Sequence, residues 1–177
     1  MKIWCTEDFA GDTCAVARRL LGQVICHQLP DGRCLRGRIC ETEAYDGFED
    51  LASHAHRGKT PRNAVMFGPP GHVYLYLCYG IHWLLNVTTR EAGYPAAVLI
   101  RGIDGALGPG KLTRALALDG GQNLLRLGPP GPVWVEAGPP VPASAVAALP
   151  RVGIDYAGPV WAAVPWRFRD VRAYASG

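Results

Sequence analysis

The sequence predicts a mixed α/β domain in which helices flank a curved, largely antiparallel β-sheet. Two pairs of segments alternate apolar and polar residues and are joined by short turns, a pattern typical of β-hairpins. Short segments before, between and after these hairpins have the signals of helix starts and ends. The 177 residues are enough to bury a substantial core without disulfides or metal, so we expect one domain over residues 1–177.

The first half of the chain predicts a helix followed by a hairpin. Asp12 and Gly22 enclose an apolar, Arg-containing segment as a helix start and a helix end do, which predicts a helix over 12–22. Residues 23–29 and 34–45 alternate as strands, and the Pro-Asp-Gly sequence between them favours a turn. Residues 46–63 have little periodicity and are expected to form an ordered loop, in which Thr60-Pro61 opens a single helical turn.

The second half predicts a tighter hairpin and a sheet that closes on the tail. Residues 73–78 and 81–89 alternate as strands around Tyr79-Gly80, so Tyr79 is expected at an exposed tip. The other expected elements are a strand over 95–103, a helix over 112–118, a short strand over 133–135, and a tail over 151–172 that packs back onto the sheet.

Composition and charge limit the classes of function. No run of about 18 apolar residues is present, and Glu7, Asp8 and Asp12 lie where a signal peptide has its apolar segment. We therefore expect a soluble cytoplasmic protein with no membrane partner. Residues 1–50 contain 6 Lys/Arg and 9 Asp/Glu, whereas 51–177 contain 12 and 6. This asymmetry permits a basic face against phosphates, although a mixed solvated surface explains it equally well.

The strand over 34–45 has an unusual polar face. Alternation places Glu41, Glu43 and Tyr45 on one side, and two carboxylates are costly to bury without partners. An exposed polar strand face is the ordinary explanation, and the pattern alone does not choose between Glu41 and Glu43. A buried carboxylate beside aromatic rings acts as a general base towards water and stabilises a developing cation.

Glycosidic cleavage needs both of these roles, because its transition state resembles an oxocarbenium ion. The tyrosines of the second hairpin and His54 would stack on a flat heterocycle, such as a base flipped out of a nucleic acid. An exposed Tyr79 would act as a wedge that fills the gap left in the base stack. Arg57, Lys59 and Arg62 would bind the flanking phosphates, and Lys111 at a helix start would contact the DNA backbone.

Several motifs in this order resemble one family closely. They are R-I-C-E-T-E-A-Y at 38–45, T-P-R-N-x-x-M-F at 60–67, Y-L-Y-L-C-Y-G at 74–80, Asn86, Arg101 and G-P-G-K-L at 108–112. These motifs identify the chain as a compact, bacterial-type member of the alkyladenine (3-methyladenine) DNA glycosylase family. The resemblance covers about residues 12–170. The resemblance implies a monofunctional enzyme that flips alkylated or deaminated purines out of duplex DNA and hydrolyses the N-glycosidic bond, without a metal or organic cofactor.

The resemblance also implies roles for particular residues. Glu43 would activate the water, and Arg101 would help to hold the water or the nearby phosphate. A main-chain carbonyl near Val152 would also touch that water. The residues that would contact the base are Tyr45, His54, Tyr76 and Asn86, of which Asn86 would clash with the 2-amino group of guanine. Tyr79 would intercalate from a hairpin in the minor groove. Ile81, His82 and Trp83 depart from the family pattern, so the shape of this wedge is left open.

Two alternatives remain at this stage. The first is a non-catalytic protein that binds damaged DNA and keeps the pocket without the chemistry. The second is a metal-dependent hydrolase that uses Glu43, His54 and His56, since an H-x-H pair is a possible zinc ligand set. We otherwise expect a monomer with no obligate protein partner, which works on damaged double-stranded DNA at the bacterial nucleoid. The preferred lesions and the roles of Glu41 and His56 do not follow from the sequence.

Overall fold

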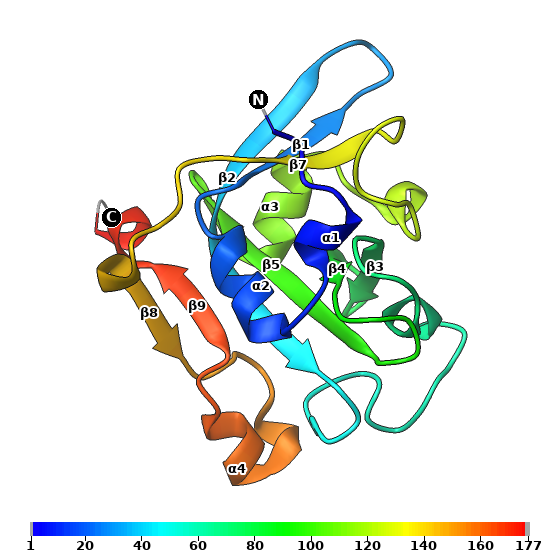
Figure 1. Cartoon of the computed structure of the whole chain (residues 1–177), viewed down its shortest axis with the longest axis vertical. Helices are drawn as coiled ribbons and strands as arrows, with labels where there is room; N and C mark the ends of the chain where they lie inside the picture. The colour runs from blue at the N-terminus through cyan, green and yellow to red at the C-terminus, as the bar shows by residue number, and fades with distance from the viewer. Residues whose placement is uncertain (1, 176–177) are drawn as a thin grey trace.

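The computed structural model describes residues 2–175, in which nine strands form one sheet whose neighbouring strands all run antiparallel (Figure 1). The main path of the sheet has the order β3, β4, β5, β2, β1, β7. Its strands are β1 (Val24–Gln28), β2 (Cys34–Asp46), β3 (Val73–Cys78), β4 (His82–Thr88), β5 (Ala96–Ile103) and β7 (Val133–Glu136). The predicted mixed α/β fold around a largely antiparallel sheet is confirmed.

The long strand β2 occupies the centre of the sheet. Its first half pairs with β1, and its second half pairs with β5 on one side and with β9 (Arg167–Asp170) on the other. Glu43 lies opposite Leu99 of β5 and opposite Arg167 of β9. Because strands bond to both edges of β2 at this point, the backbone that positions Glu43 is held from both sides.

Helices cover one face of this sheet. In α2 (Thr13–Leu20) the Asp12 carboxylate accepts a hydrogen bond of 2.8 Å from the Ala15 amide, as the predicted helix start requires. Helix α2 packs across β2 and β5, and α3 (Pro109–Ala115) packs against β4 and β5. Their buried residues, among them Leu20 and Leu112, join one apolar core with Leu85 of the sheet.

The second hairpin has the predicted form. The turn between β3 and β4 places Tyr79 at φ 51° and Gly80 at φ 71°, the two positive angles of a type I′ turn. Tyr79 is 92% exposed at this tip. On β3, Tyr74 packs with Met66 and Ala97 on one side of the sheet, away from the main core on the other.

Three boundaries differ from the prediction by three residues or more, and the others by two at most. Helix α3 begins at Pro109 rather than Leu112, because Pro109 takes the first helical position after Gly108 at φ 118°. It ends at Ala115 rather than Leu118, since Ala117 has a positive φ of 51° that no α-helix accommodates. The helical turn expected from Thr60-Pro61 forms later, as the 3-10 helix η1 (Ala64–Phe67).

The tail packs back onto the sheet as predicted, but it contains elements that the sequence did not indicate. Strand β8 (Val146–Leu149) pairs with β9, and α4 (Gly158–Ala163) lies beside them at the lower left of Figure 1. The remaining short elements are α1 (Thr6–Phe9), β6 (Ala106–Leu107), η2 (Gly120–Gln122), η3 (Ala143–Ala145), η4 (Asp155–Ala157) and η5 (Val171–Tyr174). Among the helices in residues 2–175, none is long and apolar enough to cross a bilayer.

Candidate active site

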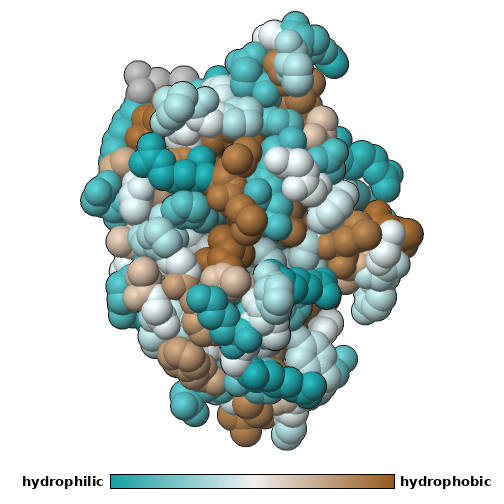
Figure 2. All heavy atoms as spheres, turned by 90° about the vertical axis from the view of Figure 1, so that its right-hand side faces the viewer, coloured by the Kyte–Doolittle hydropathy of each residue, from teal (hydrophilic) through white to brown (hydrophobic). Residues whose placement is uncertain are grey.

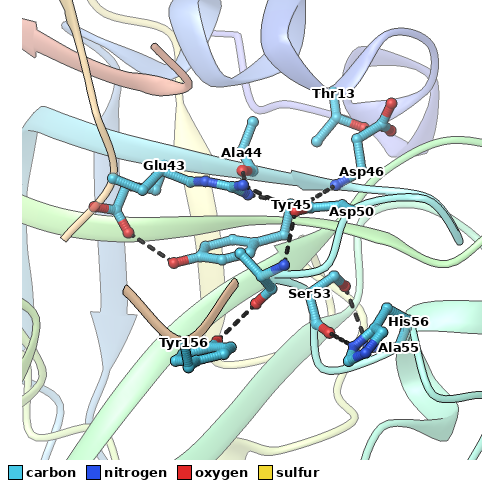
Figure 3. Close-up of polar contacts among 12 residues, drawn as sticks. Thr13, Glu43, Ala44, Tyr45, Asp46, Asp50, Ser53, Ala55, His56 and Tyr156 are labelled. Atoms are coloured by element: carbon cyan, nitrogen blue, oxygen red, sulfur yellow. Dashed lines mark hydrogen bonds and ion pairs between the residues drawn. The ribbon is translucent and has the colours of Figure 1, made fainter. Parts of the chain in front are cut away.

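Glu43 is the most completely buried acidic group of the polar strand face. Its side chain has no exposed surface, so the alternative of a solvated strand face is wrong. The Tyr45 hydroxyl donates to its Oε2 at 2.9 Å, and the Val152 amide donates to its Oε1 at 2.9 Å. Figure 3 shows the Tyr45 ring beside Glu43, with its hydroxyl pointing at the carboxylate. The two donors hold the carboxylate in one orientation.

Arg101 lies between the two glutamates of β2. Its Nη1 is 3.4 Å from Oε1 of Glu43, and its Nε is 3.5 Å from Oε1 of Glu41. Glu41 also accepts a hydrogen bond of 2.9 Å from Nη1 of Arg167 and one from the Tyr174 hydroxyl. Glu41 is therefore occupied by donors of β9 and the tail, which distinguishes it from Glu43.

The surroundings of Glu43 shift its protonation equilibrium. Burial raises the pKa of Glu43, while the Arg101 charge, the Val152 amide and the Tyr45 hydroxyl oppose that rise. The net pKa lies above the ordinary value for a glutamate. A carboxylate with a raised pKa accepts a proton more readily than an exposed one, as a general base must.

A cavity of about 440 Å³ opens in front of this network. All five of the predicted residues other than Glu43 that would contact base or water lie in its wall, namely Tyr45, His54, Tyr76, Asn86 and Arg101. Glu43 itself is not in the wall and lies behind Tyr45, Arg101 and Val152. The cavity is therefore lined by aromatic and amide groups, with the carboxylate one layer deeper.

The aromatic wall is an interlocked set of rings. The rings of His54 and Tyr76 meet edge to face with centroids 4.7 Å apart, and those of Tyr74 and Tyr76 lie 5.3 Å apart. Nδ1 of His54 is 3.1 Å from the Tyr74 hydroxyl. Burial, and then the nearby Arg62 charge, lower the pKa of His54, which favours the neutral ring. A neutral ring stacks on a base without the desolvation cost of a charge.

Asn86 is fixed by its backbone neighbours. Its Nδ2 donates to the carbonyls of Tyr74 and Leu84, at 3.1 and 3.3 Å. The amide group is buried and lines the cavity from β4, the strand next to β5. A side chain held in this way presents a rigid polar surface to any ring that enters.

The exposed side of the second hairpin is apolar at its tip. Leu77, Tyr79 and Ile81 are exposed there, with Ile81 at 70%. On the face shown in Figure 2, brown apolar residues form a projection at the right, and others lie in a band near the centre and at the bottom, among mostly hydrophilic residues. An exposed apolar group gains free energy only when a partner covers it, which favours insertion into another molecule.

The four predicted backbone-binding cations do not gather at one point. The guanidinium of Arg62 lies 5.2 Å from the Tyr76 ring centroid and donates to the Leu77 carbonyl. Arg57 shares a second hollow with Arg62, Nζ of Lys59 is 5.7 Å from the Phe67 ring, and Lys111 is exposed on the first turn of α3. Arg57, Lys59 and Arg62 thus follow the loop beside the cavity, while Lys111 is on a helix packed against β4.

Glu43, His54 and His56 are not arranged as metal ligands. Within the described residues 2–175, no group of three or more His, Cys, Asp or Glu side chains is placed to hold a metal ion. His54 faces Tyr74 and Tyr76, whereas Nδ1 of His56 contacts the Ser53 carbonyl at 3.2 Å. The geometry gives the metal-hydrolase alternative no ligand set.

Four groups in or near the site escaped the sequence analysis. The Val152 amide contacts Glu43, where the resemblance implied a carbonyl that touches water. Tyr156 lines the cavity rim, and its hydroxyl donates to the Ala52 carbonyl at 2.9 Å. Asp50 and Arg151 form a buried ion pair beneath Tyr45. The available signals were the acidic loop at 46–50 and the R-V-G sequence at 151–153, neither of which indicates burial.

The chain matches the family model described as methylpurine-DNA glycosylase over residues 7–106 and 104–173. A protein of Anaeromyxobacter dehalogenans named "Putative 3-methyladenine DNA glycosylase" is 50% identical to it over 90% of this chain and 78% of the relative. Proteins with the same name from Methanocella arvoryzae and Myxococcus xanthus are 46% and 44% identical. These alignments cover 89% and 98% of this chain, and 87% and 94% of the relatives.

Proposed function

This chain belongs to the methylpurine-DNA glycosylase family, and we propose that it flips alkylated or deaminated purines out of duplex DNA and cuts their N-glycosidic bonds with water. It is a DNA glycosylase, a hydrolase of N-glycosidic bonds that acts in DNA repair. The observation that supports the proposed mechanism is the unexposed Glu43 carboxylate, which two hydrogen-bond donors and the Arg101 charge hold directly behind an aromatic cavity.

Glu43 acts as the general base in this proposal. A water between Tyr45, Arg101 and Val152 gives a proton to Glu43 while its oxygen attacks C1′ of the deoxyribose. The electron pair of the N-glycosidic bond leaves with the base. The negative carboxylate stabilises the positive charge that develops on the sugar ring, and Arg101 limits the carboxylate to one orientation. The products are a free base and an abasic site.

The cavity walls bind the flipped base. Tyr45 stacks on one side, and the His54 and Tyr76 rings stack on the other. The rigid Asn86 amide excludes the 2-amino group of guanine. Tyr79 enters the duplex from the minor groove and replaces the flipped nucleotide in the stack.

The DNA backbone meets the basic loop in this proposal. Arg57, Lys59 and Arg62 bind phosphates beside the cavity, and Lys111 binds the backbone from α3. We also propose that the protein acts as a monomer, without an obligate protein partner, at the bacterial nucleoid. Neutral deaminated bases and cationic alkylated bases both stack on the aromatic rings of this cavity.

A non-catalytic binder of damaged DNA is disfavoured by the position of Glu43. A protein that only binds the base has no use for an unexposed carboxylate with a raised pKa behind the cavity wall. Such groups are typical of sites that transfer protons.

The test uses end-labelled duplexes that each contain one candidate lesion: hypoxanthine, ethenoadenine, 7-methylguanine or 3-methyladenine. Each duplex is incubated with excess protein in EDTA and then treated with alkali, which cuts abasic sites. We expect strand cleavage at the lesion that depends on alkali, and insensitivity to EDTA. Lesion binding without any cleavage would contradict the proposed chemistry, and activity lost only in EDTA would contradict the metal-free mechanism.

A further inference from the structure

Arg151 is a buried cation directly behind the base-binding wall. Its side chain and that of Asp50 both have no exposed surface. Two parallel hydrogen bonds join them, from Nη1 at 2.6 Å and from Nη2 at 2.8 Å. Nη1 also donates to the Ala44 carbonyl at 2.9 Å. This pair is independent of the Glu41–Arg101 network described above.

Each partner of the pair fixes a different part of the site. The Ala44 carbonyl belongs to β2 between Glu43 and Tyr45, so the contact from Arg151 reaches the strand at the centre of the site. Asp50 also accepts from the amides of Asp46 and Ala52, at 3.2 and 3.1 Å, in the loop that leads to His54. Figure 3 shows these contacts meeting at Asp50, next to Tyr45.

The third part is the segment that follows Arg151. Val152 is the next residue, and its amide is the backbone donor to Glu43. The Arg151 guanidinium lies 4.8 Å from the centroid of the Tyr45 ring and 5.1 Å from that of Trp166. One side chain thus touches the stacking wall, the strand of the general base, and the loop of the opposite wall.

Stability alone is a poor explanation of this pair. Removing two charges from water costs free energy that their attraction often does not recover, and replacing such a pair by apolar residues of similar size is often neutral or stabilising. Nε of Arg151 is buried with no hydrogen-bond partner, which adds to that cost. The Asp50–Arg151 pair costs free energy to bury, yet its hydrogen bonds are short and it lies beside the candidate active site. Its effect on the positions of the site residues is therefore the better explanation.

We propose that the Asp50–Arg151 pair is a positioning device, which holds the Val152 amide on Glu43 and sets the spacing between Tyr45 and the His54 loop. This inference rests on the proposed glycosylase mechanism. Neither residue touches the base or the water. Losing the pair should therefore slow the chemical step through misplacement of other groups, with less effect on folding than on rate.

The test replaces both charges by apolar residues of similar size, in the double variant Asp50→Leu/Arg151→Met. A matched control, Arg36→Met/Glu136→Gln, removes the Arg36–Glu136 ion pair that joins β2 to the edge strand β7. Melting temperature, lesion-duplex affinity and single-turnover base release are measured for both variants and the wild type. Single-turnover rates are recorded across pH.

We expect the double variant to melt near the wild-type temperature and to release base about 10- to 100-fold more slowly, as small misplacements in active sites do. The acid limb of its rate profile should move to higher pH, because the Val152 amide is one of the groups that lower the pKa of Glu43. The control variant should keep both the rate and the acid limb. If the Asp50–Arg151 pair only stabilised the fold, the double variant would have the acid limb of the wild type.

Arg151→Lys is the second variant, since it keeps the charge but not the paired hydrogen bonds to Asp50. We expect a smaller loss of rate and a shift of the acid limb in the same direction. A folded double variant with the wild-type rate and profile would overturn the inference, as would an unfolded double variant together with an unaltered Arg151→Lys. Wild-type protein that releases no base would instead contradict the proposed function.

Discussion

Replacement of Tyr45 by Phe removes one hydroxyl and leaves the stacking ring in place. That hydroxyl donates to Oε2 of Glu43 at 2.9 Å and is one of the groups that oppose the raised pKa of Glu43. A hydrogen bond to a charged group contributes about 1.5–3 kcal/mol. This contribution stabilises the ionised form of Glu43, so that form is the one destabilised when the hydroxyl is removed. Without it the pKa of Glu43 rises further, and the acid limb of the rate profile moves to higher pH.

The size of this effect follows from the same free energy. About 1.4 kcal/mol is tenfold in a rate, so at a pH on the acid limb Tyr45→Phe should release base roughly 10- to 150-fold more slowly than the wild type. At a pH where Glu43 is ionised in both proteins the two rates should converge. The assay is single-turnover release of hypoxanthine from a duplex across pH. Tyr94→Phe, a tyrosine beside Phe48 rather than Glu43, is the control.

An acid limb at the same pH in Tyr45→Phe and the wild type would refute this reasoning. It would mean that the Tyr45 hydroxyl does not stabilise the ionised form of the group that limits the rate. A loss that is equal at every pH would point to base stacking instead.

The other predictions concern the wedge, the charges of the tail and the core. Tyr79→Ala should weaken binding to a lesion duplex more than binding to the free modified base in fluorescence titrations, and an equal loss on both would argue against a wedge. Asp170→Asn should lower the melting temperature at pH 7, because Arg172 and Arg38 hold the pKa of Asp170 well below its usual range. Since the folded pKa is depressed, this difference should be present above the unfolded pKa and should disappear as the pH falls through the folded one; a constant difference in acid would contradict it. Leu85→Ala should reduce the free energy of unfolding by about 2–5 kcal/mol in urea titrations, and a loss under 1 kcal/mol would place Leu85 outside the tightly packed core.

Local patterns in the sequence were sufficient for β2 and for the hairpin of β3 and β4, though not for β9, which also pairs with β2 at Glu43. The alternation along β2 placed Glu41, Glu43 and Tyr45 on one face, and the Tyr79-Gly80 turn marked the exposed tip. Both features depend on neighbours within a few residues. The short strand β8 had no such signal, because its pairing with β9 is decided by residues about 20 positions later.

The site residues that belong to local motifs could be predicted from the sequence. Those that depend on contacts between residues far apart in the chain could not. Nothing near Asp50 indicates that Arg151, about 100 residues later, will neutralise it. Likewise the strand pattern alone did not choose between Glu41 and Glu43, because the residues that occupy Glu41, Arg167 and Tyr174, lie on the tail. Burial of charge depends on the assembled sheet, so a single strand pattern cannot reveal it.

The most direct test of the central claim is single-turnover base release by Glu43→Gln on a hypoxanthine duplex, at protein concentrations that saturate binding. Gln keeps the size of the side chain and can still accept from Tyr45 or Val152, but it is not a base. We expect lesion binding like that of the wild type and a rate at least about 100-fold lower, the contribution usual for a general base. Release at the wild-type rate with full occupancy would remove Glu43 from the mechanism.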